Sequence, residues 1–259
     1  MITITNQKIA GFIPSWADFR GYSLLFDNPG QCLTASGSLL ALDCSVDNDT
    51  QLSFYRELST SLTSIGREML IRSYLFCPLP AASYHVTVWD GGNIANLADI
   101  TPDHQSELKS YLDRLPLSLS NKNHLTDVVL ASPLTNYEGE IVFQFDRLVK
   151  WGNSVMVVKL KPSTQTEAQF QFLLELRRNL SAEFAKVSGL RPSAQYTPHV
   201  SLGYFANQEA AQQATPCIEQ WSEVIRESLG DLQLSFRTIS LYGFTDIAHF
   251  FKAGGNNQK

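Results

Sequence analysis

The stretch "SYHVTVWD", residues 83 to 90, places an imidazole and a hydroxyl inside an apolar run typical of a β-strand. Side chains alternate along a strand, so His85 and Thr87 share one side while Tyr84 and Val86 share the other. One face of this strand is then polar and reactive, and the other is apolar. We therefore expect His85 and Thr87 to belong to a site on the face of a sheet.

A second stretch, "PHVSLGYF" at residues 198 to 205, repeats this arrangement with His199 and Ser201. Apolar residues at helical spacing precede each stretch, at residues 51–65 and 164–187. The order of a helix followed by a histidine-bearing strand thus occurs twice, which indicates a weak internal repeat. Matching positions in a repeat favour one shared site over two unrelated core histidines that are merely hydrogen-bonded.

A histidine followed two residues later by Ser or Thr does not by itself identify a site residue. His104 and His124 have it too, followed by Ser106 and Thr126. His104 falls in the first turn of a helix expected after Thr101, where residues i and i+2 do not face the same way. His124 follows a polar loop, and we expect it at the surface. The strand context therefore singles out His85 and His199.

The two motifs together resemble the signature motifs of the 2H (two-histidine) phosphoesterase superfamily, and the chain looks similar to a larger, divergent branch related to bacterial RNA 2′,3′-cyclic phosphodiesterases. The resemblance implies an α+β fold, a bilobal clamp of two mainly antiparallel sheets with helices outside, a pseudo-two-fold axis and a central cleft. It implies that His85, Thr87, His199 and Ser201 are catalytic. RNA-directed members often have a basic residue five positions after the second histidine, where this chain has Tyr204.

The domain organisation expected is one bilobal domain over residues 1–259, with residues 1–50 as a family-divergent N-terminal extension. A chain of this length with 44% hydrophobic residues can bury a substantial core. Besides the helices at 51–65 and 164–187, the patterns predict helices from Thr101 onward and over 208–230, the latter broken near Pro216. The predicted strands are 21–26, 38–43, 68–76, 83–90, 127–132, 140–151, 154–161, 199–205, 232–244 and 248–253.

Composition excludes several classes of protein. The net charge of −5 and the lack of a basic run argue against a protein that coats nucleic acid. The four cysteines form no CxxC pair, so neither a zinc site nor a redox motif is indicated. No apolar run has the length of a signal peptide core or a membrane span. We expect a cytoplasmic monomer without a cofactor, a membrane contact or an obligate protein partner.

The residue types suggest how a phosphodiester is hydrolysed. An ordinary imidazole pKa of about 6.5 lets one histidine act as base and the other as acid near neutral pH. The hydroxyls of Thr87 and Ser201 can donate to phosphoryl oxygens. A metal site would lack an evident third ligand, because Asp90 points away from His85 in a regular strand. A nucleophilic serine would lack an orienting carboxylate.

The expected function is hydrolysis of a cyclic or linear phosphodiester in a nucleotide, an RNA end or a related small molecule. The predicted substrate-binding residues are Tyr204, Tyr84 and Tyr242, although aromatic residues in strands more often belong to the core. The alternative is a non-catalytic module that binds nucleotides or RNA ends with the same clamp. Binding alone would not need two titrating groups, which favours the enzyme. The sequence leaves open the substrate and which histidine is the base.

Overall fold

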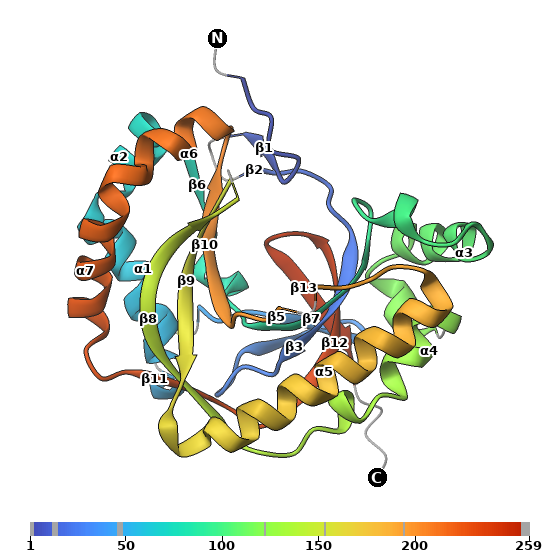
Figure 1. The fold of residues 1–259 in the computed structure, drawn as a ribbon. Coiled ribbons are helices and arrows are strands. Elements are labelled where there is room, and N and C mark those ends of the chain that lie inside the picture. Colours follow the sequence, from blue (N-terminus) through green and yellow to red (C-terminus); the bar gives the residue numbers. More distant parts are fainter. Residues whose placement is uncertain are drawn as a thin grey trace.

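The computed structural model describes residues 3–11, 15–45, 49–121, 123–152, 154–193 and 195–254. Over these residues the chain forms two large antiparallel sheets with helices on the outside, together with a small two-stranded ribbon (Figure 1). The ribbon consists of β1 (Ile9–Gly11) and β2 (Ser15–Trp16). The predicted α+β class with two antiparallel sheets is confirmed.

One large sheet has five strands in the described part of the chain, and it contains the second motif. In spatial order they are β11 (Gln233–Phe236), β8 (Ile141–Trp151), β9 (Val155–Pro162), β10 (His199–Phe205) and β6 (Phe76–Pro78). Strands β8 and β9 are the longest, and the turn between them begins at Gly152 with φ of +52°, a conformation that suits glycine. The sequence "GN" at 152 and 153 is typical of a tight turn, and Asn153 lies outside the described residues.

The other large sheet contains the first motif and has six described strands. In spatial order they are β4 (Leu33–Ser36), β5 (Leu39–Leu42), β13 (His249–Ala253), β12 (Ile239–Asp246), β3 (Gly21–Phe26) and β7 (Thr87–Asn93). Every residue of β3 is buried, which explains its largely apolar sequence. Because β3 lies between β12 and β7, Gly21–Phe26 of the N-terminal part of the chain form an inner strand of this sheet.

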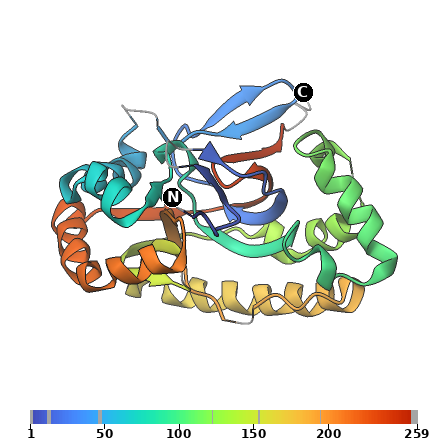
Figure 2. The same ribbon diagram turned by 90° about the horizontal axis from the view of Figure 1, so that it is seen from above.

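The helices lie in two groups on opposite sides of the molecule (Figures 1 and 2). The first group consists of α1 (Ser53–Ile65), α2 (Arg67–Tyr74), α6 (Gln208–Ala214) and α7 (Ile218–Leu229). Helices α2, α6 and α7 pack against the five-stranded sheet, and α1 packs on α7. The second consists of α3 (Pro102–Asp113), α4 (His124–Leu130) and α5 (Glu167–Ser188). The predicted break near Pro216 is confirmed, since a short 3₁₀ turn separates α6 from α7.

Aromatic side chains join the two sheets. Phe26 of β3 stacks on Phe236 of β11 with 4.7 Å between ring centroids, and it meets Phe143 of β8 edge-on at 5.7 Å. Strands β11 and β12 belong to different sheets, although only two residues separate them. The predicted strand 232–244 is thus divided in two. Burial of these rings holds the two sheets together.

Helix α5 covers the strand of the first motif. The indole of Trp89 donates a 3.1 Å hydrogen bond to Ser181 Oγ, and its ring meets Phe184 edge-on at 5.0 Å. The helix that precedes the second motif in sequence thus packs on the strand of the first. The strand of the first motif therefore packs against a helix from the other half of the chain.

Two predicted strands are short helices. Residues 68–76 form α2 up to Tyr74, where Glu68 in the first turn pairs with Arg72 in the last turn at 2.7 Å and Leu70 alone is fully buried. Charges of this sign stabilise the ends of a helix. Residues 127–132 lie mostly in α4, which starts with a capping box between Asn123 and Thr126. The end charges of α2 and the capping box of α4 outweighed the apolar runs.

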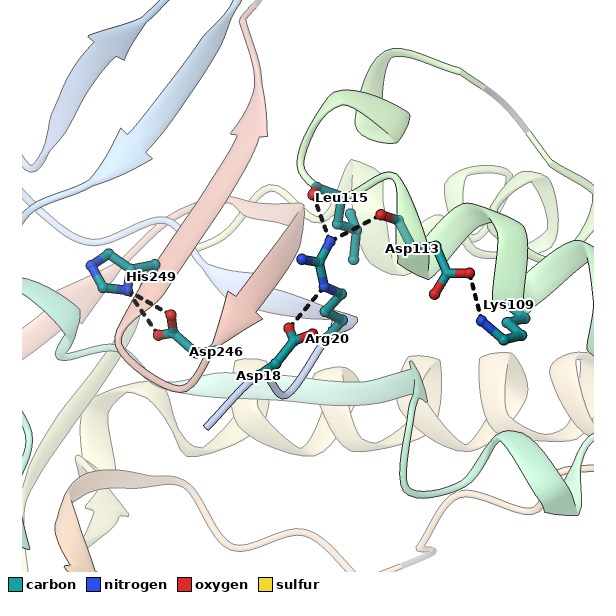
Figure 3. Close-up of polar contacts among 7 residues, drawn as sticks. All are labelled: Asp18, Arg20, Lys109, Asp113, Leu115, Asp246 and His249. Atoms are coloured by element: carbon teal, nitrogen blue, oxygen red, sulfur yellow. Dashed lines mark hydrogen bonds and ion pairs between the residues drawn. The ribbon is translucent and has the colours of Figure 1, made fainter. Parts of the chain in front are cut away.

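The chain entering β3 is tied to the end of α3 (Figure 3). Arg20 donates to the carbonyls of Asp113 and Leu115 at 3.0 and 3.1 Å, and its Nε pairs with Asp18 at 2.8 Å. These bonds satisfy carbonyls that a helix end leaves free.

Among the described helices, none is both long enough and apolar enough to cross a membrane.

Candidate active site

His85 lies just ahead of its strand and not within it. A short 3₁₀ turn, Ala81–Ser83, precedes it, and β7 begins only at Thr87. The ring Nδ1 lies 2.7 Å from the carbonyl oxygen of Ser83, and the ring packs on Phe250 with 4.2 Å between centroids. Because a carbonyl can only accept, Nδ1 carries the proton, and Nε2 is left as the basic nitrogen.

His199 is held in the same manner as the first residue of β10. Its Nδ1 lies 2.9 Å from the carbonyl oxygen of Thr197, and its ring meets Trp151 edge-on at 4.4 Å. In both motifs the histidine therefore bonds to the carbonyl two residues earlier and rests on an aromatic ring. The arrangement fixes the same tautomer and restrains the ring orientation twice.

A bulge in β7 changes which residues share a face. Leu24 pairs with Trp89 and Leu25 pairs with Thr87, so Val88 is an extra residue. Val88 and Trp89 are both fully buried, whereas Thr87 is half-buried and Asp90 is exposed. The bulge therefore brings Asp90 to the side of Thr87, contrary to the expectation for a regular strand. Burial lowers the pKa of the His199 imidazole, and the negative charge of Asp90 partly opposes this shift.

A second bulge lies in β10 between Ser201 and Gly203. It leaves Leu202 as the extra residue, so Tyr204 and not Gly203 follows His199 and Ser201 on the same face. A side chain at position 203 would have no room, since an added Cβ would lie 2.4 Å from the carbonyl oxygen of Cys77 in β6. The glycine and the bulge together turn Tyr204 toward the site.

A cavity of about 750 Å³ lies at this face. Its lining includes His199, Ser201 and Tyr204 from the second motif, with Lys8 and Phe19 from the N-terminal segment. His85 and Thr87 are not among the residues that line it. His85 is linked to the cavity electrostatically, because the positive charges of His199 and Lys8 both act on its imidazole.

Both imidazoles are made less basic by their surroundings. Burial lowers the pKa of His85 to about 4, and the nearby His199 and Lys8 act in the same direction. Burial also lowers the pKa of His199, again with a contribution from Lys8, while Asp90 opposes the shift. Desolvation and like charges both disfavour the imidazolium form. Both rings are therefore neutral near pH 7 in the free protein.

Lys8 lines the cavity, and the sequence did not indicate it as a candidate site residue. Its Nζ lies 3.4 Å from the hydroxyl of Tyr204, 5.0 Å from the centre of that ring and 4.8 Å from the centre of the Phe19 ring. The sequence showed no basic residue at position 204, and the structure brings an ammonium to Tyr204 from the other end of the chain. No local pattern around Lys8 indicated this.

Arg177 and Tyr196 connect the two motifs. The hydroxyl of Tyr196 donates a 3.0 Å hydrogen bond to the carbonyl of Thr87, and Arg177 Nε donates to the carbonyl of Val88. The guanidinium lies 4.2 Å from the centre of the Tyr196 ring. The carbonyls at the bulge, which lack regular ladder partners, are thus satisfied by α5 and by the loop before β10.

The other two predicted substrate-binding tyrosines lie in the core. Tyr84 and Tyr242 are each 1% exposed, and neither lines the cavity. Tyr84 packs against Tyr55 with 5.9 Å between ring centroids. The Tyr242 hydroxyl donates to Asp27 Oδ1 at 2.8 Å. Of the three predicted tyrosines, the structure brings only Tyr204 to the cavity.

His104 and His124 lie together on α3 and α4, with 5.3 Å between their ring centroids. Glu107 joins them, since one carboxylate oxygen accepts from the backbone N–H of His124 at 2.9 Å and the other lies 3.6 Å from His104 Nδ1. Thr126, two residues after His124, belongs to the capping box of α4. The motif spacing at His124 thus has a structural cause.

No three histidine, cysteine, aspartate or glutamate side chains among the described residues are grouped as metal ligands. Within the described ranges, His85 and His199 have no third donor of these types grouped with them. The donor set therefore differs from the three protein ligands usual for catalytic zinc.

Comparison with known proteins gave likenesses in structure alone. No protein-family model and no curated protein sequence matches the chain. A conserved protein of unknown function from Agrobacterium tumefaciens has a similar structure, with a TM-score of 0.54 and 14% identity over 96% of this chain and 89% of that chain. Usb1 of Kluyveromyces marxianus also aligns, over 91% of this chain and 97% of that chain, at 12% identity. The TM-scores are 0.42 for Usb1 with uridine monophosphate and 0.41 for Usb1 alone. The Agrobacterium likeness shows the fold and nothing of the chemistry.

Proposed function

We propose that this protein is a metal-independent phosphodiesterase, which hydrolyses a cyclic or linear phosphodiester of a nucleotide, an RNA end or a related small molecule. The observation that carries the proposal is the matched state of the two histidines. Each Nδ1 is bound to the carbonyl two residues earlier, at 2.7 Å for His85 and 2.9 Å for His199. Both Nε2 atoms are thereby kept for proton transfer.

The proposed chemistry assigns one proton to each imidazole. One Nε2 takes a proton from the attacking water as a bond forms between the water oxygen and phosphorus. The other, protonated, gives its proton to the leaving oxygen as its bond to phosphorus breaks, so that a cyclic substrate yields a phosphomonoester. Thr87 and Ser201 donate hydrogen bonds to the non-bridging oxygens. Tyr204, at the cavity, contacts the rest of the substrate.

The low basicity of both imidazoles is compatible with this chemistry. In the free protein neither ring holds a second proton near pH 7, because burial lowers the pKa of both His85 and His199. A bound phosphodiester carries a negative charge, which raises the pKa of an imidazole beside it. The substrate would thus help to protonate the ring that acts as acid.

The cavity supports a ligand of nucleotide size. Its volume of about 750 Å³ falls within the usual range for small-molecule sites. Aromatic rings of Phe19 and Tyr204 and the amides of Gln7 and Gln208 line it. Rings offer stacking surfaces and amides offer donors and acceptors, which together suit a nucleobase.

The test is a panel of 2′,3′-cyclic mononucleotides, RNA with a cyclic phosphate end and ADP-ribose-type cyclic phosphates, each incubated with EDTA. We expect turnover of at least one class, unaffected by EDTA and lost in His85→Ala and in His199→Ala. Saturable binding without turnover would instead identify a nucleotide-binding module. Loss of activity with EDTA and recovery with a divalent ion would contradict the metal-independent mechanism.

A further inference from the structure

Lys8 is a cation without a carboxylate partner in the described part of the chain. Eight other lysines and arginines form ion pairs with Asp or Glu there, whereas none of these pairs includes Lys8. An ammonium has three donors, and the one hydrogen bond that it makes within the described residues, to the Tyr204 hydroxyl, is long at 3.4 Å. The described side chains therefore take up only a small part of its hydrogen-bonding capacity at the wall of the cavity.

Hydrogen bonds to the end of β10 hold the segment that leads to Lys8 in place. The segment before it is fastened to the end of β10, where the backbone N–H groups of Thr5 and Asn6 donate to the carbonyl of Ala206 at 2.9 and 3.0 Å. The Asn6 amide adds a 2.9 Å bond to the carbonyl of Phe205. These contacts join residues about two hundred positions apart, and they hold Lys8 over the strand of the second motif. Figure 1 shows β1 and the segment before it at this end of β10.

The Lys8 ammonium also acts on the two histidines of the candidate site. Its positive charge disfavours protonation of both His85 and His199. A cation that acts on two imidazoles, one of which must be protonated for catalysis, is unfavourable in the empty site, and a bound anion offsets this repulsion. The two aromatic rings at Lys8 stabilise the ammonium without neutralising it.

We propose that Lys8 is a phosphate-binding residue of this site, which donates to the anionic oxygens of the substrate's phosphoryl group while Phe19 and Tyr204 hold its side chain in place. This inference rests on the proposed function. It makes the N-terminal segment a part of the active site. An acidic protein thereby acquires a local positive charge at the cavity, which suits an anionic ligand of small size.

The experiment measures binding of inorganic phosphate by calorimetry to the wild-type protein and to Lys8→Met, Lys8→Arg and Lys109→Met. Lys109→Met is the matched control, because Lys109 is an exposed lysine of α3 already paired with Asp113 at 2.6 Å (Figure 3). We expect Lys8→Met to weaken phosphate binding on the order of 10-fold, the usual worth of a charge-assisted hydrogen bond. Lys8→Arg keeps the charge and should bind more tightly than Lys8→Met, and Lys109→Met should match the wild type.

Three results would overturn the inference: no saturable phosphate binding by the wild-type protein, equal binding by Lys8→Met, or an equal loss in Lys109→Met. If Lys8→Met does not fold, as judged by thermal unfolding, Lys8→Gln replaces it as a polar side chain of similar reach. The binding assay needs no turnover, so it decides the role of Lys8 even if every substrate of the panel fails. Conversely, activity that depends on His85 and His199 but not on Lys8 would refute this inference and leave the proposed function standing.

Discussion

The hydroxyl of Tyr196 donates a 3.0 Å hydrogen bond to the carbonyl of Thr87, and so ties the loop that leads into the second motif to the first residue of the first motif strand. The two residues are 109 positions apart in sequence. Tyr196 is three residues before His199, and Thr87 is two residues after His85. One bond thus bears on the relative placement of both histidines.

We predict that Tyr196→Phe lowers kcat about 10-fold with little change in KM, because a small shift between acid and base affects the transition state more than binding. The free energy of unfolding should fall by about 1 kcal/mol, the typical net value of one hydrogen bond. Kinetics and denaturant unfolding measure both effects. Tyr74→Phe is the control. The Tyr74 hydroxyl contacts Cys217 Sγ at 3.2 Å, and neither residue lines the cavity. An unchanged kcat in Tyr196→Phe would show that this bond does not position the motifs.

The two histidines should be the most sensitive positions in the protein. His85→Ala and His199→Ala should each lower kcat on the order of 10²-fold or more, the scale for removing a general acid or base. Thr87→Ala and Ser201→Ala should have smaller effects, because each removes one donor that water can partly replace. Steady-state kinetics on the best substrate of the panel, with circular dichroism to confirm folding, tests the order.

The control for this series is the pair with the same spacing elsewhere. His104→Ala and His124→Ala should leave kcat unchanged, since both rings lie on α3 and α4 and contact each other and not the cavity. A loss as severe as that of His85→Ala in a folded His104 or His124 variant would place the site at α3 and α4 instead.

The pH dependence of kcat/KM should be bell-shaped, with its maximum on the acid side of pH 6.5. This quantity reports the pKa values of the free protein, where one imidazole must be neutral and the other charged. Burial and Lys8 lower the pKa of both rings, His199 adds to the shift at His85, and Asp90 opposes it at His199. A maximum above pH 7 in initial-rate measurements would contradict this electrostatic description.

His85 should also make stability depend on pH. Its pKa is about 4 in the folded protein and about 6.5 in an unfolded chain, so between these values the unfolded state binds more protons. The free energy of unfolding should therefore decrease as pH falls from 6.5 to 4, with at most about 1.4 kcal/mol per pH unit from this group. Urea unfolding of wild type and His85→Gln isolates the contribution, since the variant should show a shallower slope. Equal slopes would mean that His85 is not desolvated.

Local sequence predicted several of the elements that carry the candidate site. The identity of the two motifs, the long helix α5 and the strands β8, β9 and β10 follow from periodicity and turn residues, which act between neighbours in the chain. Two strand predictions were wrong because competing local signals for helix and strand were close in strength. Segments 68–76 and 127–132 carry apolar runs, yet end charges and the Asn123 capping box made them helical.

Only the tertiary structure decided what surrounds the motifs. The sequence by itself determined which residues carry the imidazoles and hydroxyls. It could not show the bulges in β7 and β10, because a bulge is defined by pairing with a partner strand, and these bulges turn Asp90 and Tyr204 toward the site. Nor could it place Lys8, which reaches Tyr204 across 196 positions of chain. Such contacts depend on how whole sheets pack. No local sequence pattern shows which distant residue will lie beside Tyr204.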